Sequence, residues 1–318
     1  MRQPESRFAI SIWISYLPFP CLALHSWPSM TRRRIYKLRL RRGNFLLGRK
    51  TLVMGVLNVT PDSFSDGGEF LDTRLAVQRA MEIQRDGADI IDIGAESTRP
   101  GSKEISAAEE LSRLLPVLEA LQRKLKIPIS VDTQKAAVAE IAIGAGAQVI
   151  NDVSGLRRDP QMADVVARHG AAIVLMHMRG TPRTMQKMPF AKNVMKDVFN
   201  GLRQSVALAR SAGIAKDKIV IDPGIGFGKS FEQNYEFLAK LTEFAKLGYP
   251  LLVGPSRKGF LAKTLARHGK PAPVEERLWG TAATVTASIL GGAHMVRVHD
   301  VKEIVQVARI ADCIASAR

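Results

Sequence analysis

The chain has 318 residues, of which 46% are hydrophobic and 24% are charged. This composition is typical of a soluble globular protein and excludes a disordered, collagen-like or membrane-embedded chain. Two cysteines, Cys21 and Cys313, are too few for a disulfide framework or a cysteine-ligated metal cluster, and they suit a reducing cytoplasm. The formal net charge is +16, but residues 1–50 hold 11 of the 46 basic and one of the 30 acidic residues. The remainder is only mildly basic, which fits an anionic substrate.

Residues 1–35 are expected to form an extension outside the folded domain. Its apolar part contains Pro18 and Pro20, which disfavour a membrane-spanning helix, and its basic residues follow that part, the reverse of a signal peptide. We interpret it as a disordered tail or start-site extension, with targeting, membrane or unspecific nucleic-acid roles as alternatives. The alternation of residues 36–50 around Gly43 and Asn44 predicts a hairpin, so we place the domain at 36–318, with its barrel at 51–318.

From Thr51 onward, short segments rich in Val and Ile alternate with longer amphipathic ones. Such short segments, bounded by turns, predict strands buried on both faces, as in a parallel sheet. We expect strands at 52–58, 90–94, 129–132, 149–152, 172–177, 219–222, 251–254 and 295–299. Helices are expected between and after them, including 74–86, 107–125, 135–145, 194–212, 277–290 and 301–314. Eight such units predict an α/β fold of the (β/α)8 TIM-barrel type; a doubly wound sheet is disfavoured because no Gly-x-Gly-x-x-Gly follows the first strand.

Polar side chains stand at or just past the carboxyl end of nearly every predicted strand. They are Asn58, Glu96, Asp132, Asn151, His177, Asp222, Ser256, Lys258 and His299. One such residue is often a helix N-cap, but a ring of them is typical of the barrel face that carries an active site.

Several segments resemble the signatures of dihydropteroate synthases, in the same order along the chain. Residues 54–68 match the first signature without a gap, and residues 91–101 match the second. Further matches are 131–133, 150–152, 222–229, 256–258 and 297–300. The resemblance implies condensation of 6-hydroxymethyl-7,8-dihydropterin diphosphate with 4-aminobenzoate, giving 7,8-dihydropteroate and pyrophosphate. It also implies a cytoplasmic homodimer that sulfonamides target.

The chemistry of this reaction explains the residue types. An aromatic amine is uncharged at neutral pH, so the main difficulty is the charge that develops on the departing diphosphate. Asp222 can accept two parallel hydrogen bonds from the 2-amino and N3–H groups of a pterin. The resemblance assigns the pterin to Asp132, Asn151, Met176, Asp222, Phe227 and Lys258. The alternatives are that the polar residues cap helices and that Met176 fills the core.

The end of the last predicted strand carries a candidate diphosphate site. Arg297 and His299 lie two residues apart, so they point to the same face. Asn58 ends the first strand, which adjoins the last once the barrel closes. Its amide oxygen suits Mg²⁺, the expected cofactor, which takes few protein ligands and keeps water and diphosphate oxygens. The predicted catalytic set is Asp132, Asp222, Lys258, Arg297 and His299.

Two loops, 60–69 and 97–101, are expected to close over the reaction and exclude water. The resemblance places the following residues around the aminobenzoate or in these loops: Phe64, Ser65, Asp66, Thr98, Arg99, Pro100, Ser256 and Gly259. Gly259 stands where some family members have serine, so backbone N–H groups would have to contact the aminobenzoate carboxylate.

Residues 224–230 end in Gly-Lys-Ser and imitate a nucleotide-binding P-loop. That motif needs a glycine five residues before Gly228, where this chain has Pro223. We expect the glycines to allow close approach of the backbone to a flat substrate.

Two other functions stay open. A related pterin-binding methyltransferase would use methyltetrahydrofolate and a corrinoid partner but needs no diphosphate site, so Asn58, Arg297 and His299 favour the synthase. A catalytically silent pterin-binding paralogue would have lost charged pocket residues, and none of the expected ones is missing. We expect small-molecule substrates as partners and a homodimer formed by the last two helices, with neither nucleic acid nor membrane bound.

Overall fold

The computed structural model describes residues 33–60, 68–99, 101–187 and 190–317, with only the backbone for 68–72. Most of the expected N-terminal extension lies outside these ranges. So do four predicted site residues: Phe64, Ser65, Asp66 and Pro100. From Arg33 onward the chain forms one compact unit.

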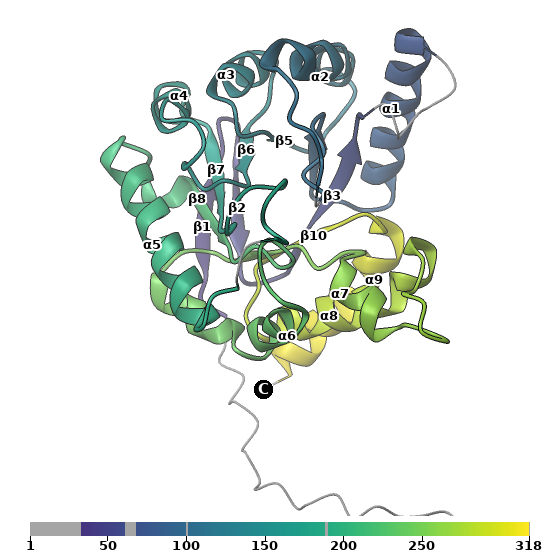
Figure 1. Ribbon diagram of the computed structural model, residues 1–318. Helices are drawn as coiled ribbons and strands as arrows, with labels where there is room; N and C mark the ends of the chain where they lie inside the picture. The colour runs from purple at the N-terminus through teal and green to yellow at the C-terminus, as the bar shows by residue number, and fades with distance from the viewer. Residues whose placement is uncertain (1–32, 61–67, 100, 188–189, 318) are drawn as a thin grey trace, which may run out of the picture. The chain divides into compact units, whose positions relative to one another are not determined.

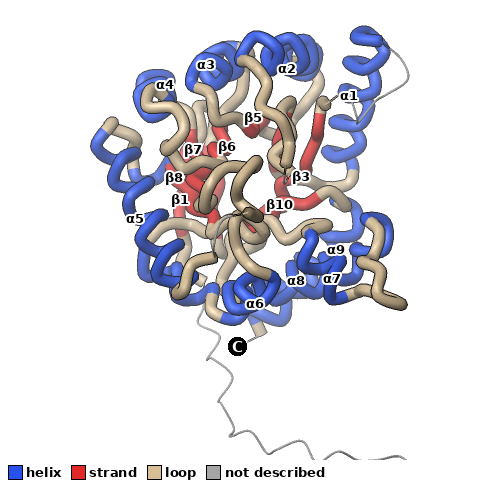
Figure 2. The backbone as a smooth tube through the Cα atoms, viewed as in Figure 1, coloured by secondary structure: helices blue, strands red, loops and turns tan. Residues whose placement is uncertain are grey.

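Eight parallel strands form the wall of a barrel (Figures 1 and 2). They are β3 (Leu52–Asn58), β4 (Ile90–Gly94), β5 (Ile129–Asp132), β6 (Val149–Asp152), β7 (Ala172–Met176), β8 (Ile219–Asp222), β9 (Leu252–Val253) and β10 (Met295–Val298). Their order is β8-β7-β6-β5-β4-β3-β10-β9, and a bridge between Ile221 and Leu251 joins the two ends. The predicted TIM barrel is confirmed, with each strand correct to within one residue. The strand β9 is short, and Leu251 just before it donates its N–H to the side chain of His294 over 3.2 Å.

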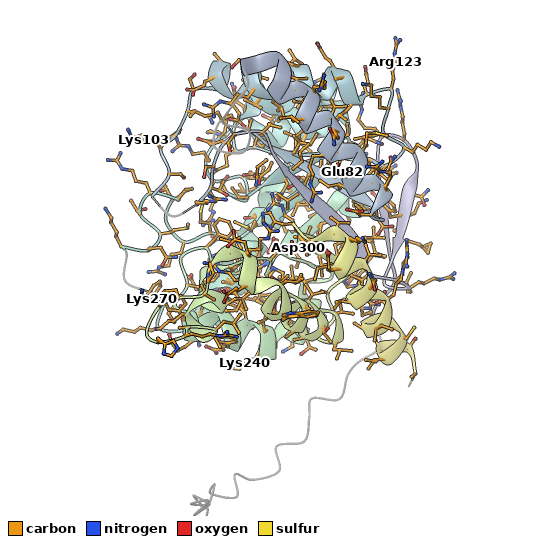
Figure 3. The ribbon with its side chains drawn as sticks, turned by 90° about the vertical axis from the view of Figure 1, so that its right-hand side faces the viewer. Glu82, Lys103, Arg123, Lys240, Lys270 and Asp300 are labelled. Atoms are coloured by element: carbon orange, nitrogen blue, oxygen red, sulfur yellow. The ribbon has the colours of Figure 1, made fainter. Side chains whose placement is uncertain are left out.

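Helices surround the strands (Figure 2). They are α1 (Gly68–Arg85), α2 (Ala107–Leu121), α3 (Ala136–Gly144), α4 (Met162–His169), α5 (Val194–Ser211), α6 (Phe231–Ala239), α7 (Gly259–Thr264), α8 (Leu278–Leu290) and α9 (Val301–Ser316). Short 3-10 helices cover Lys216–Lys218, Leu241–Leu247 and Val274–Arg277. Helix α2 ends four residues earlier than predicted, because the chain then turns to donate the amides of Lys126 and Ile127 to Gln84 of α1. Charged side chains such as Lys103, Arg123, Lys240 and Lys270 cover the outside (Figure 3).

The predicted hairpin consists of antiparallel β1 (Tyr36–Arg39) and β2 (Asn44–Leu47). Its buried Leu38 and Leu47 pack on Leu52 and other residues at the amino ends of the barrel strands, so the hairpin covers that end of the barrel. Just before it, Arg33 donates to Thr51 Oγ1 over 2.7 Å and to Asp312 of α9 over 2.5 Å. These contacts tie Arg33 to the barrel, three residues before the predicted domain boundary.

Candidate active site

The carboxyl ends of the barrel strands meet at one face, and the predicted polar residues gather there. Asp132, Asn151 and Asp222 end or nearly end β5, β6 and β8, and they are 8%, 3% and 5% exposed. Arg297 reaches the same face from β10, and Lys258 reaches it from the loop after β9. Successive parallel strands therefore place these side chains in one barrel mouth, as the sequence predicts.

Arg297 connects two carboxylates of this mouth. Its Nε donates to Asp92 Oδ2 over 2.6 Å, and its Nη2 donates to Asp132 Oδ2 over 2.9 Å. Asn151 donates its side-chain amide to the same oxygen of Asp92 over 3.0 Å. The guanidinium is thus fixed in place, while its Nη1 has no hydrogen-bond partner in the part of the chain that the structure describes.

Sequence reasoning missed Asp92. The residue is fully buried in β4, and its second oxygen, Oδ1, has no hydrogen-bond partner among the described residues. The strand-end pattern does not include it, because Asp92 lies inside its strand. The available signal was a carboxylate between Ile91 and Ile93, in a strand expected to be buried on both faces.

Burial and mutual charge set the ionisation of the mouth. Burial raises the pKa of Asp132 to about 7, against the opposing effect of Arg297, and raises that of Asp222 to about 6. Burial and repulsion from Arg297 lower the pKa of Lys258 to about 8. Burial alone would lower the pKa of Arg297, but Asp92 and Asp132 raise it instead. At neutral pH the mouth therefore presents two cations beside carboxylates.

The glycine-rich loop after β8 fixes Asp222. Asp222 Oδ1 accepts the N–H of Gly224 over 2.7 Å. Gly224 has φ +69°, and a Cβ there would lie 2.0 Å from the carbonyl oxygen of His177, so only glycine fits. Lys229 is buried and donates to the carbonyl oxygens of His177, Gly224 and Phe227 over 2.8–3.1 Å. The lysine of the P-loop-like motif thus binds the backbone of its own loop.

Lys258 lies against the apolar side of the mouth. Its ammonium is 4.0 Å from the ring centroid of Phe227, which packs with the buried Met176. The preceding residue, Arg257, has φ +58° and forms two hydrogen bonds with Asp300 (labelled in Figure 3), one of them 3.0 Å long. This ion pair holds the turn that presents Lys258. Sequence reasoning missed it, although Arg257 and Asp300 each stand inside a recognised motif.

His299 and Ser256 contact each other directly. Ser256 Oγ accepts the backbone N–H of His299 over 3.2 Å and lies 3.0 Å from its Nδ1. Burial and the nearby Arg297 lower the pKa of His299 to about 3, so the imidazole is neutral. Ser256, predicted to meet the aminobenzoate, is therefore already hydrogen-bonded to a predicted diphosphate residue.

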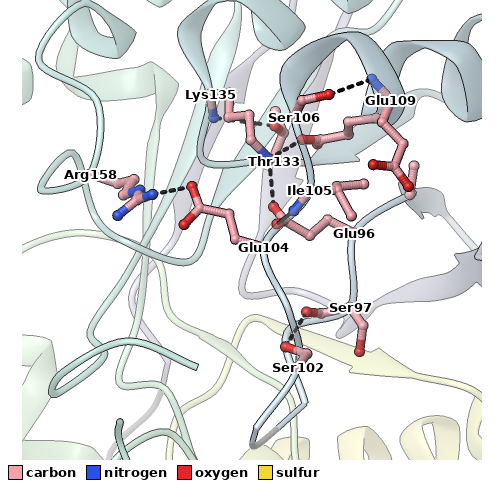
Figure 4. A network of polar contacts seen from close by, with 12 residues as sticks. Glu96, Ser97, Ser102, Glu104, Ile105, Ser106, Glu109, Thr133, Lys135 and Arg158 are labelled. Atoms are coloured by element: carbon pink, nitrogen blue, oxygen red, sulfur yellow. Dashed lines mark hydrogen bonds and ion pairs between the residues drawn. The ribbon is translucent and has the colours of Figure 1, made fainter. Parts of the chain in front are cut away.

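A buried polar network supports the second loop (Figure 4). Lys135 donates to Glu96 over 2.7 Å and to Glu110 over 2.6 Å. Glu96 also accepts the N–H of Ile105 over 3.0 Å. Glu110 is fully buried, and burial raises its pKa. The network anchors the end of the loop to α2 and α3.

The loop itself folds back between Ser97 and Ser102, whose hydroxyl donates to the Ser97 carbonyl over 2.6 Å. Thr98 and Arg99 lie at its tip, and Arg99 is exposed. The described hydrogen bonds do not join either residue to the barrel mouth. Gly259 begins α7 and faces open space, where an added Cβ would meet nothing within 4 Å.

The side chains of Asn58 and Asp132 both lie close to Gly94. A Cβ on Gly94 would be 3.4 Å from Asp132 Cβ and 3.9 Å from Asn58 Oδ1. Among the described residues, no group of three or more His, Cys, Asp or Glu side chains could hold a metal ion. The amide oxygen of Asn58 fits Mg²⁺ only where water and diphosphate supply most of the other ligands.

Comparison with known proteins agrees with this geometry. The fold and the mouth define a pterin-binding barrel, and the family described as pterin binding enzyme matches residues 54–299. A dihydropteroate synthase of Synechocystis is 48% identical over 267 residues, which are 84% of this chain and 91% of the relative.

Three solved structures of dihydropteroate synthases also match the fold of this chain. The dihydropteroate synthase of Clostridium difficile, determined with pteroic acid, has 46% identity and TM-score 0.79, covering 85% of this chain and 98% of that one. That of Yersinia pestis, in a sulfonamide complex, has 42% identity and TM-score 0.81 over 88% and 100%. That of Xanthomonas albilineans, with 4-aminobenzoic acid, has 38% identity and TM-score 0.82 over 90% and 100%.

The chain belongs to the dihydropteroate synthase family. It is a transferase of a pterinylmethyl group, and it condenses the pterin diphosphate with 4-aminobenzoate. The resemblance drawn from the sequence motifs is confirmed. In the described part of the chain, no helix combines the length and apolarity needed to cross a bilayer.

Proposed function

We propose that the barrel mouth performs this condensation with a distinct task for each group. Asp222 and Asn151 hold the donor edge of the pterin, and Lys258 donates to its carbonyl oxygen. Asp132 accepts a further ring N–H, while the ring lies against Met176 and Phe227. The observation that carries this proposal is the convergence of Asp132, Asp222, Lys258 and Arg297 in one mouth from four separate strands or loops.

The diphosphate binds at Arg297 and His299. The Nη1 of Arg297 is available to an anion because Asp92 and Asp132 occupy the rest of its guanidinium. Ser256 accepts the backbone N–H of His299, so its single hydroxyl proton can be donated to Nδ1. The neutral ring then carries its proton on Nε2, as a donor for a diphosphate oxygen.

The reaction exchanges one bond at the methylene carbon of the pterin. The carbon–oxygen bond breaks and its electron pair leaves with the diphosphate, while the amine lone pair forms the carbon–nitrogen bond and the amine then loses a proton to water. Arg297 and His299 stabilise the charge that develops on the leaving group. Mg²⁺ held at Asn58 would add positive charge to the diphosphate. The direct test incubates the purified protein with both substrates and Mg²⁺; absence of dihydropteroate and pyrophosphate would refute the proposal.

The aminobenzoate binds between the second loop and the start of α7. Thr98 and Arg99 contact it from the loop, and backbone N–H groups from Gly259 onward contact its carboxylate. We expect a bound diphosphate to order the two loops that form the aminobenzoate pocket. Magnesium pyrophosphate should therefore raise the affinity for aminobenzoate, with a coupling free energy of about 1–3 kcal/mol. Titration of labelled aminobenzoate with and without magnesium pyrophosphate measures this. Equal affinities with and without magnesium pyrophosphate would contradict the roles of Thr98 and Arg99. They would also contradict those predicted for Phe64, Ser65, Asp66 and Pro100.

The functional form is a cytoplasmic homodimer built on α8 and α9. Trp279 is 79% exposed, and Ile310 and Ile314 of α9 are 64% and 45% exposed, so the paired helices α8 and α9 present large apolar side chains to solvent. A second copy covering them would remove this area from water. Light scattering should give twice the chain mass for the natural protein and the single-chain mass for Trp279→Glu with Ile310→Glu. A monomeric natural protein would refute the dimer.

A further inference from the structure

A cavity lies outside the barrel mouth, lined by residues that follow β7 and by the helix α5. Both elements are labelled in Figure 1. Its volume is about 630 Å³, within the range of small-molecule sites. Among the described residues, those assigned above to the pterin, the diphosphate and the aminobenzoate do not line it. Its walls come from the loop after β6, from residues 177–179, from residues 190–193 and from α5.

The walls of this cavity carry an excess of positive charge. Its basic side chains are Arg157, Arg179, Lys192 and Lys196, and its one carboxylate is Asp197. Asp197 is shared, at 3.4 Å from Arg179 and 3.6 Å from His177. In the described part of the chain, Lys192 and Lys196 have no ion-pair partner.

The cavity walls also contain hydrogen-bond donors that the described residues leave without a partner. Among the described residues, Arg157 donates only to the carbonyl oxygens of Ser154 and Met178, at 2.8 and 2.6 Å. Helix α5 begins beside the cavity, with Asn193 as its N-cap, and adds the partial positive charge of a helix start. Two guanidinium groups, two ammonium groups and a helix start suit a phosphate group better than a neutral ligand.

The cavity is connected to the pterin loop by direct contacts. His177 lines the cavity, and burial lowers its pKa to about 2, so it is neutral. On its far side, Lys229 Nζ lies 3.3 Å from His177 Nδ1 and donates to the carbonyls of Gly224 and Phe227. Burial lowers the pKa of Lys229 to about 7, so a nearby anion favours the charged form that holds these carbonyls.

We propose that this cavity is a second anion site, which takes a phosphorylated small molecule and strengthens pterin binding through His177 and Lys229. The proposal has two parts, anion binding in the cavity and its coupling to pterin binding, and they depend on different observations. Anion binding is independent of the proposed function, whereas the coupling rests on the pterin roles of Asp222 and Phe227.

Ribose 5-phosphate is a suitable probe, titrated into the full-length protein by calorimetry. The variant Lys192→Gln with Lys196→Gln should bind it at least tenfold more weakly than the natural protein. The control, Lys124→Gln with Lys126→Gln, removes the same charge from the exposed turn after α2, next to Arg123 in Figure 3, and should bind normally. His299→Ala, which alters the diphosphate site, should also keep this binding. Equal weakening in the control, or undiminished binding in the cavity variant, would overturn the site.

The coupling is measured with 6-hydroxymethylpterin. Saturating ribose 5-phosphate should tighten pterin binding about fivefold or more in the natural protein and leave it unchanged in the cavity variant. Binding of ribose 5-phosphate without any change in pterin affinity would overturn the coupling. If the natural protein binds ribose 5-phosphate but no pterin, the result would instead count against the proposed function.

Discussion

At the scale of the single residue, one oxygen of Asp222 holds the glycine loop. The other has no hydrogen-bond partner among the described residues and is the acceptor that we propose for the pterin. Asp222→Asn can keep the bond to Gly224 but replaces the second acceptor by a donor that faces the N–H groups of the ring. Charge-assisted hydrogen bonds contribute about 1.5–3 kcal/mol each, so pterin affinity should fall about 100-fold or more. Calorimetry with 6-hydroxymethylpterin measures the loss, and an unchanged melting temperature shows that the barrel is intact. Near-normal affinity in this variant would contradict the assignment.

The raised pKa of Asp222 predicts opposite effects of acid on binding and on stability. Below about pH 6 the carboxyl is protonated, so pterin affinity should decrease as the pH falls from 7 to 5. The folded pKa is above the unfolded one, so protonation favours the folded state, and this contribution to stability grows over the same range by about 1 kcal/mol. The measurement is the difference in unfolding free energy between the natural protein and Asp222→Asn at pH 7 and pH 5. A difference that stays constant would show that the pKa is not raised.

Single residues also mark the limit of what the sequence predicts. The strand-end rule found Asp132, Asn151 and Asp222, because parallel strands align their carboxyl ends whatever the loops do. It could not find Asp92, whose place inside a strand makes sense only once Arg297 reaches it from a strand 205 residues away. The pairing of Ser256 with His299 was equally hidden, because hydrogen bonds between loops depend on how the loops pack and not on periodicity.

At the scale of elements, Lys135 joins the second loop to α2 through Glu96 and Glu110. Lys135→Met leaves the fully buried carboxylate of Glu110 without its cation, which should lower the unfolding free energy by about 3 kcal/mol. Replacing both residues, as Lys135→Met with Glu110→Met, removes the buried charge and should recover most of the lost unfolding free energy. Urea denaturation compares the variants. Equal losses in the single and double variants would show that the ion pair is not what stabilises this region.

The elements themselves were predicted well for a physical reason. Strands buried on both faces are mostly apolar, apart from a few polar residues such as Asp92, so β3 to β8 and β10 are visible in the sequence. Helix ends were less exact, as for α2, because its last turn competes with the contacts that Gln84 offers to the following chain. A local pattern cannot reveal a partner on another helix.

At the scale of the whole molecule, the hydrogen bonds of Arg33 predict where truncation becomes harmful. Deletion of residues 1–29 should leave turnover and melting temperature unchanged and improve solubility by removing an apolar stretch. Deletion of residues 1–34 also removes Arg33, whose side chain is 6% exposed in its pair with Asp312, and should cost about 3 kcal/mol of stability. Thermal unfolding and turnover of the two truncated proteins test this. Inactivity of the shorter deletion would mean that residues 1–29 belong to the folded domain.

The barrel closes where its first strand, β3, pairs with its last, β10. A chain still emerging from the ribosome can build the earlier strands only as an open sheet, with one edge of β3 exposed until the final strand arrives. Such an edge is prone to pairing with the wrong chain. Asn58 stands on one side of this seam, and Arg297 and His299 stand on the other. If Asn58, Arg297 and His299 bind the diphosphate as proposed, the strand pairing that removes this exposed edge also assembles that site, and bound substrate should stabilise the closed barrel.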